Sequence, residues 1–146
     1  MGEIDGKKDI RDLLEIATKI NDKKNPLMKK NNFFDYMMSN IDNPQFWVLV
    51  NKENGKMIAC LVATEVRNQY DQYMWIDFIW GDRRYSVEGD KHVPNTAVGE
   101  LYNLLLDMCR KMGYKKIRAS VTRGFKFYEK FFGKKEISRM FEIEVK

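Results

Sequence analysis

The chain has 146 residues, a length that suits one domain, and we expect residues 1–146 to form a single one. Hydrophobic residues make up 44% and aromatic residues 13% of the sequence, a composition that forms a packed core and excludes intrinsic disorder. The net charge of +5 favours anionic partners of several kinds. No apolar run approaches the roughly 20 residues that span a bilayer, so we expect a cytoplasmic protein without a membrane partner.

Two helical patterns open the chain. Residues 9–20 place apolar side chains at helical spacing, with Asp9 and Asp12 near the expected start, where the helix dipole favours negative charge. The apolar residues expected to share one face of this helix are Ile10, Leu13, Leu14, Ala17 and Ile20. A second, shorter helix is predicted over residues 33–41 and is ended by Asn43-Pro44.

Three strands are predicted next. Residues 46–50 (FWVLV) form a continuous apolar run, as in a buried strand. Residues 56–66 (KMIACLVATEV) return as a second strand, and the turn between them contains Asn54-Gly55, the pair favoured where φ is positive. Residues 73–80 (YMWIDFIW) are the third. The first two strands therefore form an antiparallel hairpin.

The second half of the chain adds helices and strands in alternation. The clearest helix is predicted over residues 96–112, where Gly113 marks its end. Residues 115–121 alternate as a strand, residues 124–132 form a short aromatic helix, and residues 136–145 form a last strand. A strand on each side of the long helix implies one parallel pair. The predicted fold is α/β (α+β), with a mixed, mostly antiparallel central sheet and helices on both faces.

Cysteine and histidine content bears on the chemistry of the chain. Cys60 and Cys109 lie in apolar or helical pattern, and we expect both to be reduced, buried thiols. His92 is the only histidine, so no metal-ligand spacing is present. We therefore predict neither a metal site nor Cys-His catalysis.

Three segments, in this order, resemble the GNAT acetyltransferase superfamily. Residues 46–66 resemble its hairpin of second and third strands, and residues 101–121 resemble its central helix leading into the fifth strand. Residues 125–136 (FKFYEKFFGKKE) resemble its last helix. Only Glu3 and Ile4 could supply its short first strand. The resemblance implies a GNAT-like acyltransferase that moves an acetyl group from acetyl-CoA, its co-substrate, to a primary amine of a small molecule or protein.

The resemblance also implies a cofactor site at the start of the central helix. The family opens this helix with Gln or Arg-x-x-Gly-x-Gly or Ala, so that backbone amides approach the pyrophosphate. Here the motif positions hold Val93, Thr96 and Val98. One alternative is a cradle rebuilt from the first turn with neighbouring arginines: Thr96, Ala97, Val98, Gly99, Arg83 and Arg84. The other is a catalytically inactive GNAT-fold binding module that holds a protein or nucleic-acid partner.

For the acetyl group, the resemblance implies backbone amides at the end of the third predicted strand, at Phe78, Ile79 and Trp80. The fourth and fifth family strands part at this point. Tyr128 matches the helix tyrosine that protonates the departing thiolate, although it also fits an aromatic core position. Nucleic acid remains a further partner class, but no recognition helix or stacking motif is present in the sequence.

The candidate general base is Asp77. A carboxylate buried among aromatic residues has a raised pKa, which suits a base. Strand alternation places Asp77 on one face with Trp75 and Ile79, where it could instead cap a helix or pair with an arginine. Glu65 on the neighbouring strand is its rival.

Overall fold

The computed structural model describes residues 3–20, 29–82, 84 and 96–119. Its elements, in chain order, are β1 (Glu3–Asp5), α1 (Ile10–Thr18), α2 (Lys30–Ser39), β2 (Phe46–Glu53), β3 (Lys56–Arg67), β4 (Gln72–Gly81), α3 (Thr96–Met112) and β5 (Ile117–Ala119). The described strands form one sheet in the order β1-β2-β3-β4-β5. The predicted helix over 124–132 and the predicted strand over 136–145 lie outside the described residues.

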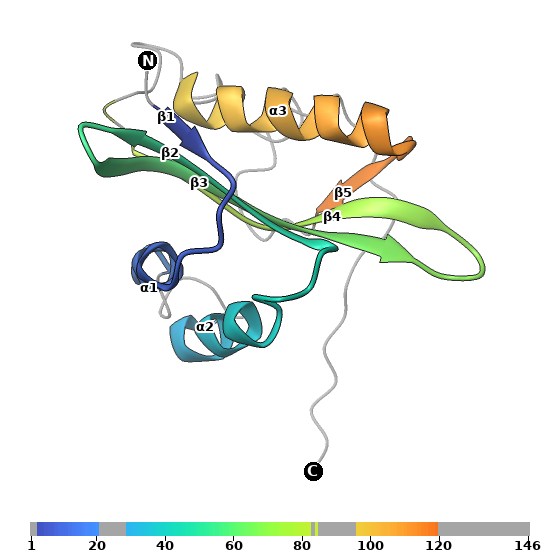
Figure 1. Ribbon diagram of the computed structural model, residues 1–146, viewed down its shortest axis with the longest axis horizontal. Helices are drawn as coiled ribbons and strands as arrows, with labels where there is room; N and C mark the ends of the chain where they lie inside the picture. The colour runs from blue at the N-terminus through green and yellow to red at the C-terminus, as the bar shows by residue number, and fades with distance from the viewer. Residues whose placement is uncertain (1–2, 21–28, 83, 85–95, 120–146) are drawn as a thin grey trace.

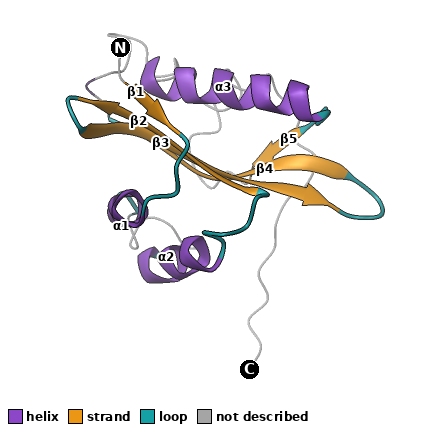
Figure 2. Ribbon diagram, viewed as in Figure 1, coloured by secondary structure: helices purple, strands orange, loops and turns teal. Residues whose placement is uncertain are grey.

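Helices cover both faces of this sheet. α1 and α2 lie on one face and α3 lies on the other (Figures 1 and 2). Neighbouring strands are antiparallel, except that β4 and β5 are parallel. The predicted mixed, mostly antiparallel sheet is therefore confirmed.

The hairpin between β2 and β3 forms where the sequence predicts it. Glu53 pairs with Lys56 across a two-residue turn, in which Asn54 has φ 53° and Gly55 has φ 77°. Both values are positive, as this tight turn requires, and asparagine and glycine tolerate them best. β1 was the element least visible in the sequence. It runs antiparallel to β2, from Glu3 opposite Lys52 onward.

The helix pair on the first face is anchored by an apolar cluster. Phe33 and Met37 of α2 are buried there with Phe46 of β2. The remaining buried members are Leu13, Ile16, Ala17, Ile20, Val48, Val50, Met57, Cys60 and Val62. α2 begins three residues before the predicted helix and ends two residues before it.

The buried face of α1 differs from the predicted one. Ile10 and Leu14 are 50% and 51% exposed, so the expectation that they share one face with the buried Leu13, Ala17 and Ile20 is wrong. The reason is Asp12, which is buried and forms a 2.8 Å ion pair with Lys52 Nζ of β2. This contact holds the Asp12 side of the helix against the sheet. Asp9 caps the helix by accepting the amide of Arg11 at 2.8 Å.

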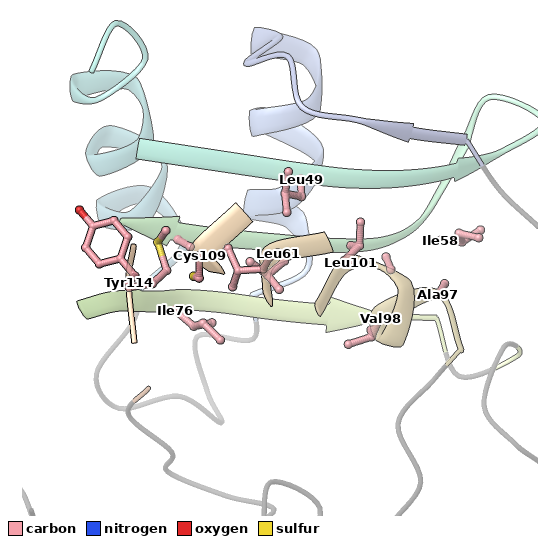
Figure 3. Close-up of a cluster of buried hydrophobic side chains, with 13 residues drawn as sticks. Leu49, Ile58, Leu61, Ile76, Ala97, Val98, Leu101, Cys109 and Tyr114 are labelled. Atoms are coloured by element: carbon pink, nitrogen blue, oxygen red, sulfur yellow. The ribbon is translucent and has the colours of Figure 1, made fainter. Parts of the chain in front are cut away.

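The second cluster lies between α3 and the other face of the sheet (Figure 3). α3 has the predicted bounds, and its end has a clear physical cause. Gly113 has φ 84°, and its amide donates to the Arg110 carbonyl at 3.4 Å. The Tyr114 amide donates to the Cys109 carbonyl at 2.9 Å. This pair of bonds is a Schellman motif, which turns the chain toward β5.

The two cysteines lie on opposite faces of the sheet. Cys60 belongs to the cluster beneath α1 and α2, and Cys109 belongs to the cluster beneath α3. Both are buried free thiols, as predicted. Burial raises the pKa of the Cys60 thiol to about 12. The Cys60 thiol therefore stays protonated and unreactive at neutral pH.

Candidate active site

A β-bulge interrupts β4 at Asp77. Val62 of β3 pairs with Phe78, whereas the next residue, Ala63, pairs with Ile76. Asp77 is thus an extra residue on β4, opposite no residue of β3. A bulge breaks the alternation of side chains and increases the local twist of a strand.

The bulge changes which side chains share a face. Asp77 bonds to Tyr36 of α2, and Phe78 packs in the cluster beneath α1 and α2, so two consecutive residues face the same side. Ile79 instead packs against the cluster beneath α3. The prediction that Asp77 and Ile79 share a face is therefore wrong, because period-two alternation holds only in a strand without a bulge.

Two hydroxyl groups contact the Asp77 carboxylate. Thr64 of β3 donates from Oγ1 to Asp77 Oδ2 at 2.7 Å. The Tyr36 hydroxyl lies 3.3 Å from Asp77 Oδ1 and 2.8 Å from Thr64 Oγ1. We call these three residues the Asp77 cluster. Its members come from a helix and two strands, so the cluster exists only in the folded chain.

Aromatic rings surround the Asp77 cluster on the helix-pair side. The Phe33 ring lies 5.7 Å from that of Phe78 and 5.8 Å from that of Tyr36. Phe46 meets Tyr36 edge to face at 5.7 Å. These rings make the setting of the carboxylate apolar and bring no charge to it. The cluster is therefore a polar group in an apolar setting.

This setting shifts the pKa values of the cluster. Burial raises the pKa of Asp77 to about 6. Hydrogen bonds donated by Thr64, and by Tyr36 whenever its hydroxyl turns toward Asp77, offset part of that rise. Burial also raises the pKa of Tyr36. A carboxylate with a pKa near neutrality can accept and release a proton under physiological conditions.

Sequence reasoning found Asp77 but missed its two partners. Thr64 carried a weak signal, because it is a polar residue at the end of the apolar run 57–63. Tyr36 carried none, since it lies 41 positions before Asp77. Only the packing of α2 on the sheet brings it to the carboxylate.

Glu65, the predicted rival of Asp77, lies on the other face of the sheet. It accepts hydrogen bonds from Trp47 Nε1 at 2.9 Å and from the Tyr114 hydroxyl at 2.7 Å. Arg67 forms an ion pair with it at 3.4 Å and also donates to the Tyr114 hydroxyl. Because both oxygens are bonded and a cation is present, Glu65 holds β2, β3 and the end of α3 together.

The end of β4 follows directly after the bulge. Phe78, Ile79 and Trp80 are all partly buried there, with their side chains alternating between the two faces. Lys19 Nζ lies 4.2 Å from the centre of the Trp80 ring and ties α1 to this end of the strand. The described part of β5 pairs with β4 at Met74–Ile76. The predicted parting of the two strands beyond that point lies outside the described residues.

The start of α3 was the second predicted part of the site. Ala97 and Val98 are buried, and Figure 3 shows both side chains at the end of the cluster where α3 begins. The Val98 side chain thus packs in the core beneath the helix. A β carbon added at Gly99 would meet no atom of the described residues within 4 Å, so that part of the chain leaves the space beside this residue open. The first turn also contains no acidic residue. These features fit a helix start that receives phosphate groups.

A buried amide anchors this first turn to the sheet. Asn51 of β2 is fully buried and donates from Nδ2 to Glu100 Oε2 at 2.9 Å and to the Ala97 carbonyl at 3.4 Å. No local pattern around Asn51 indicates this role. Asn51 therefore ties the first turn of α3 to β2.

The arginine proposed to assist the cradle has a nearby partner. Arg84 donates from Nη2 to Asp82 at 2.6 Å, and this pairing lowers the pKa of Asp82 to about 2. The predicted residues Arg83, Val93 and Tyr128 lie outside the described residues. Within the described ranges, no three His, Cys, Asp or Glu side chains are placed to hold a metal ion, and no helix has the length and apolarity of a membrane span.

Comparison with solved structures identifies the fold. No family model matches the sequence, and a search of curated proteins finds no match. A predicted acetyltransferase from Clostridium acetobutylicum with acetyl-CoA aligns over 99% of this chain and 96% of its own, with a TM-score of 0.72 and 16% identity. Aminoglycoside 6'-N-acetyltransferase from Acinetobacter haemolyticus aligns over 99% and 98%, with a TM-score of 0.71 and 12% identity.

A third neighbour is named for an amino sugar phosphate. Glucosamine-6-phosphate N-acetyltransferase from Arabidopsis thaliana aligns over 100% of this chain and 99% of its own, with a TM-score of 0.68 and 16% identity. These neighbours are GNAT acetyltransferases, and the alignments cover nearly the whole chain. The protein therefore has the GNAT fold, as the resemblance predicted.

Proposed function

We propose that the protein is an N-acetyltransferase that moves an acetyl group from acetyl-CoA to a primary amine, with Asp77 as the general base. The observation that carries the proposal is the Asp77 cluster. In this cluster a half-buried carboxylate lies at a β-bulge of the central sheet. Its pKa of about 6 suits proton transfer near neutral pH. The GNAT fold of the chain supports the reaction class, which fold alone does not fix.

The proposed path of the proton begins on the acceptor. An amine attacks only after losing the proton that it carries in water at neutral pH. Asp77, ionised above a pH of about 6, takes this proton directly or through one water molecule. Backbone amides of Phe78, Ile79 and Trp80 lie one to three positions along β4, which supports a role for them beside the reacting carbonyl.

The start of α3 is the proposed place for the phosphates of acetyl-CoA. Bound acetyl-CoA supplies the thioester carbonyl that the amine attacks. The first turn contributes backbone amides and the positive end of the helix dipole, and Gly99 leaves room on its side. Tyr128 as proton donor to the leaving thiolate stays a prediction from the sequence. So does the cytoplasmic location.

The acceptor is proposed only by class, as an amine-bearing small molecule or protein. Two of the neighbours are named for aminoglycoside and glucosamine-6-phosphate acceptors. The departures at Val93, Thr96 and Val98 favour a second candidate, a GNAT-fold binding module without cofactor. The two functions differ first in binding of acetyl-CoA.

Titration calorimetry with acetyl-CoA tests the proposal. We expect binding to the wild-type chain and a loss of at least about tenfold in affinity for Gly99→Leu, because the new side chain occupies the open space. Asn103→Leu is the matched control, since this exposed position lies one turn further along α3. It should bind like the wild type.

Acetyl transfer is then measured with a panel of amines. Release of the thiol should depend on Asp77 and be lost in Asp77→Asn. Absence of acetyl-CoA binding at millimolar ligand would reject the transferase and leave the binding module.

A further inference from the structure

We infer that Tyr36, Thr64 and Asp77 form a ring of three hydrogen bonds that closes only when Asp77 is protonated. In this ring Tyr36 and Thr64 are positioning residues that hold the proton taken from the acceptor. The ring itself is a property of the folded chain, whereas its use in acetyl transfer rests on the proposed function.

The Asp77 cluster has more hydrogen-bonding contacts than hydroxyl hydrogens when Asp77 is ionised. The three residues make three contacts, at 2.7 Å, 2.8 Å and 3.3 Å. Each contact needs one hydrogen. Thr64 and Tyr36 each carry one hydroxyl hydrogen, and an ionised Asp77 carries none. With Asp77 ionised, two hydrogens therefore serve three contacts, and one contact has no hydrogen in it.

The distances show which contact that is. Thr64 donates to Asp77 Oδ2 over the shortest distance, 2.7 Å. Its oxygen can still accept, and the Tyr36 hydroxyl lies 2.8 Å from it, closer than the 3.3 Å to Asp77 Oδ1. The Tyr36 hydroxyl has the geometry to donate to either oxygen, and the shorter distance favours Thr64 Oγ1 as the acceptor of its one hydrogen. The gap in the ring falls between Tyr36 and Asp77 Oδ1.

A proton on Asp77 fills this gap. Oδ1 is the more basic position, because Oδ2 already accepts the short bond from Thr64. When an ammonium transfers its proton, the N–H bond breaks, its electron pair stays on nitrogen, and an O–H bond forms at Oδ1. That O–H then donates to the Tyr36 oxygen, and all three contacts contain a hydrogen. After product release the proton passes to water, and the ring opens again.

The hydrogen bonds of the ring are the polar contacts that act on the pKa of Asp77. Among the described residues, the groups that set the pKa of Asp77 are its burial and the hydroxyls of Thr64 and Tyr36. Phe33 of α2, whose ring lies against those of Tyr36 and Phe78, brings no charge to the cluster. No ion pair within the described ranges reaches the Asp77 carboxylate. Changes in the two hydroxyls should therefore act on it directly.

The ring predicts that Thr64→Val and Tyr36→Phe shift the pKa of Asp77 in opposite directions. Two hydroxyls that both donated to the carboxylate would predict the same direction for both changes. Thr64→Val removes a bond to the charged carboxylate, so it should raise the pKa of Asp77 by about one unit. Tyr36→Phe removes the acceptor of the Asp77 proton, so it should lower that pKa. If Tyr36 merely donated to the carboxylate, the same change would raise it. The order expected is thus Tyr36→Phe, wild type, Thr64→Val.

Carbon-detected NMR titration of aspartate-labelled protein measures these values without any substrate. The Asp77 signal is identified by its absence from Asp77→Asn. Tyr70→Phe and Thr18→Val are matched controls at exposed positions and should leave the value unchanged. Thr64→Ser keeps the hydroxyl and should restore the wild-type value if Thr64→Val folds poorly. A rise, or no change, in Tyr36→Phe would overturn the ring.

The pH profile of kcat/KM for acetyl transfer tests the positioning role. Its acidic limb should move with the NMR pKa in each variant, which a purely structural effect would not cause. If the variants are active but the acidic limb of their kcat/KM profiles does not move, the positioning role is overturned. If the NMR order holds but no amine is acetylated, the ring stands and the proposed function fails.

Discussion

Replacing Asp77 by asparagine should make the protein more stable at neutral pH while removing its base. An asparagine amide has the shape of the protonated acid and carries the missing hydrogens. Its Nδ2 can donate to the Tyr36 oxygen, and its Oδ1 can accept from Thr64, as the protonated carboxyl does. The variant therefore fixes the ring in its closed form without the cost of a buried charge.

The sign of the effect follows from proton linkage. The pKa of Asp77 is about 6 in the folded chain, against an ordinary value of 3.8. Between these pH values the folded chain binds more protons than the unfolded chain, so the free energy of unfolding falls as pH rises. This loss is absent below a pH of about 4 and complete above a pH of about 6.

The size of the effect comes from the same shift. Each pKa unit is worth about 1.4 kcal/mol, so two units correspond to about 3 kcal/mol. Asparagine escapes this cost, and Asp77→Asn should be about 2–3 kcal/mol more stable than the wild type at pH 8. For a chain of this size that is a rise of about 5–10 °C in Tm. At pH 4 the two proteins should be equally stable.

Urea unfolding of both proteins from pH 4 to pH 8 measures the difference. Asp35→Asn is the control, because Asp35 is an exposed carboxylate on the same helix as Tyr36. It should change the free energy of unfolding by less than about 0.5 kcal/mol. The reasoning is refuted if Asp77→Asn is the less stable protein at pH 8, or if its advantage does not change with pH.

Three further outcomes are expected. Gly99→Ala should stabilise the chain by about 0.5–1 kcal/mol in thermal unfolding, because alanine favours a helix and the added carbon meets no neighbour among the described residues. Tyr114→Phe should lower the free energy of unfolding by about 1–3 kcal/mol, since it removes a hydrogen bond to the buried Glu65, while the pH profile of acetyl transfer stays unchanged. Amines of low pKa should react fastest: an α-amine, at about 8, gives its proton to Asp77 more readily than a lysine side chain, at about 10.4, and competition between two such peptides in one assay measures the ratio.

Much of the fold follows from local pattern. The turn at Asn54-Gly55 fixes the hairpin through positive φ values that few residue pairs adopt. α3 has the predicted bounds because Gly113 supplies the left-handed residue of its C-terminal motif. β1 was harder to foresee, since three residues show no periodicity. Its pairing depends on the exposed edge of β2, which exists only after the hairpin has formed.

The candidate site was only half predictable, for a physical reason. Asp77 stands out in the sequence as a charge within an aromatic strand. The bulge does not, because a bulge is a mismatch of register between two strands and neither strand alone encodes it. That mismatch turned Asp77 and Phe78 to one face and sent Ile79 to the other. Tyr36 and Asn51 depend on contacts between distant elements, so their roles are absent from any local pattern.

The half-buried Asp77 differs from the two buried acids of the described chain, Asp12 and Glu65. Asp12 is paired with Lys52 at 2.8 Å, and Glu65 is paired with Arg67. Each has a cation to offset the cost of burial. Within the described ranges Asp77 has two hydroxyls and no cation, so its negative charge stays costly. A fold that needed only structure would be more stable with asparagine at this position. Two hydroxyls hold the Asp77 carboxylate at the bulge, although its charge destabilises the chain. A role in proton transfer explains why a carboxylate occupies this position.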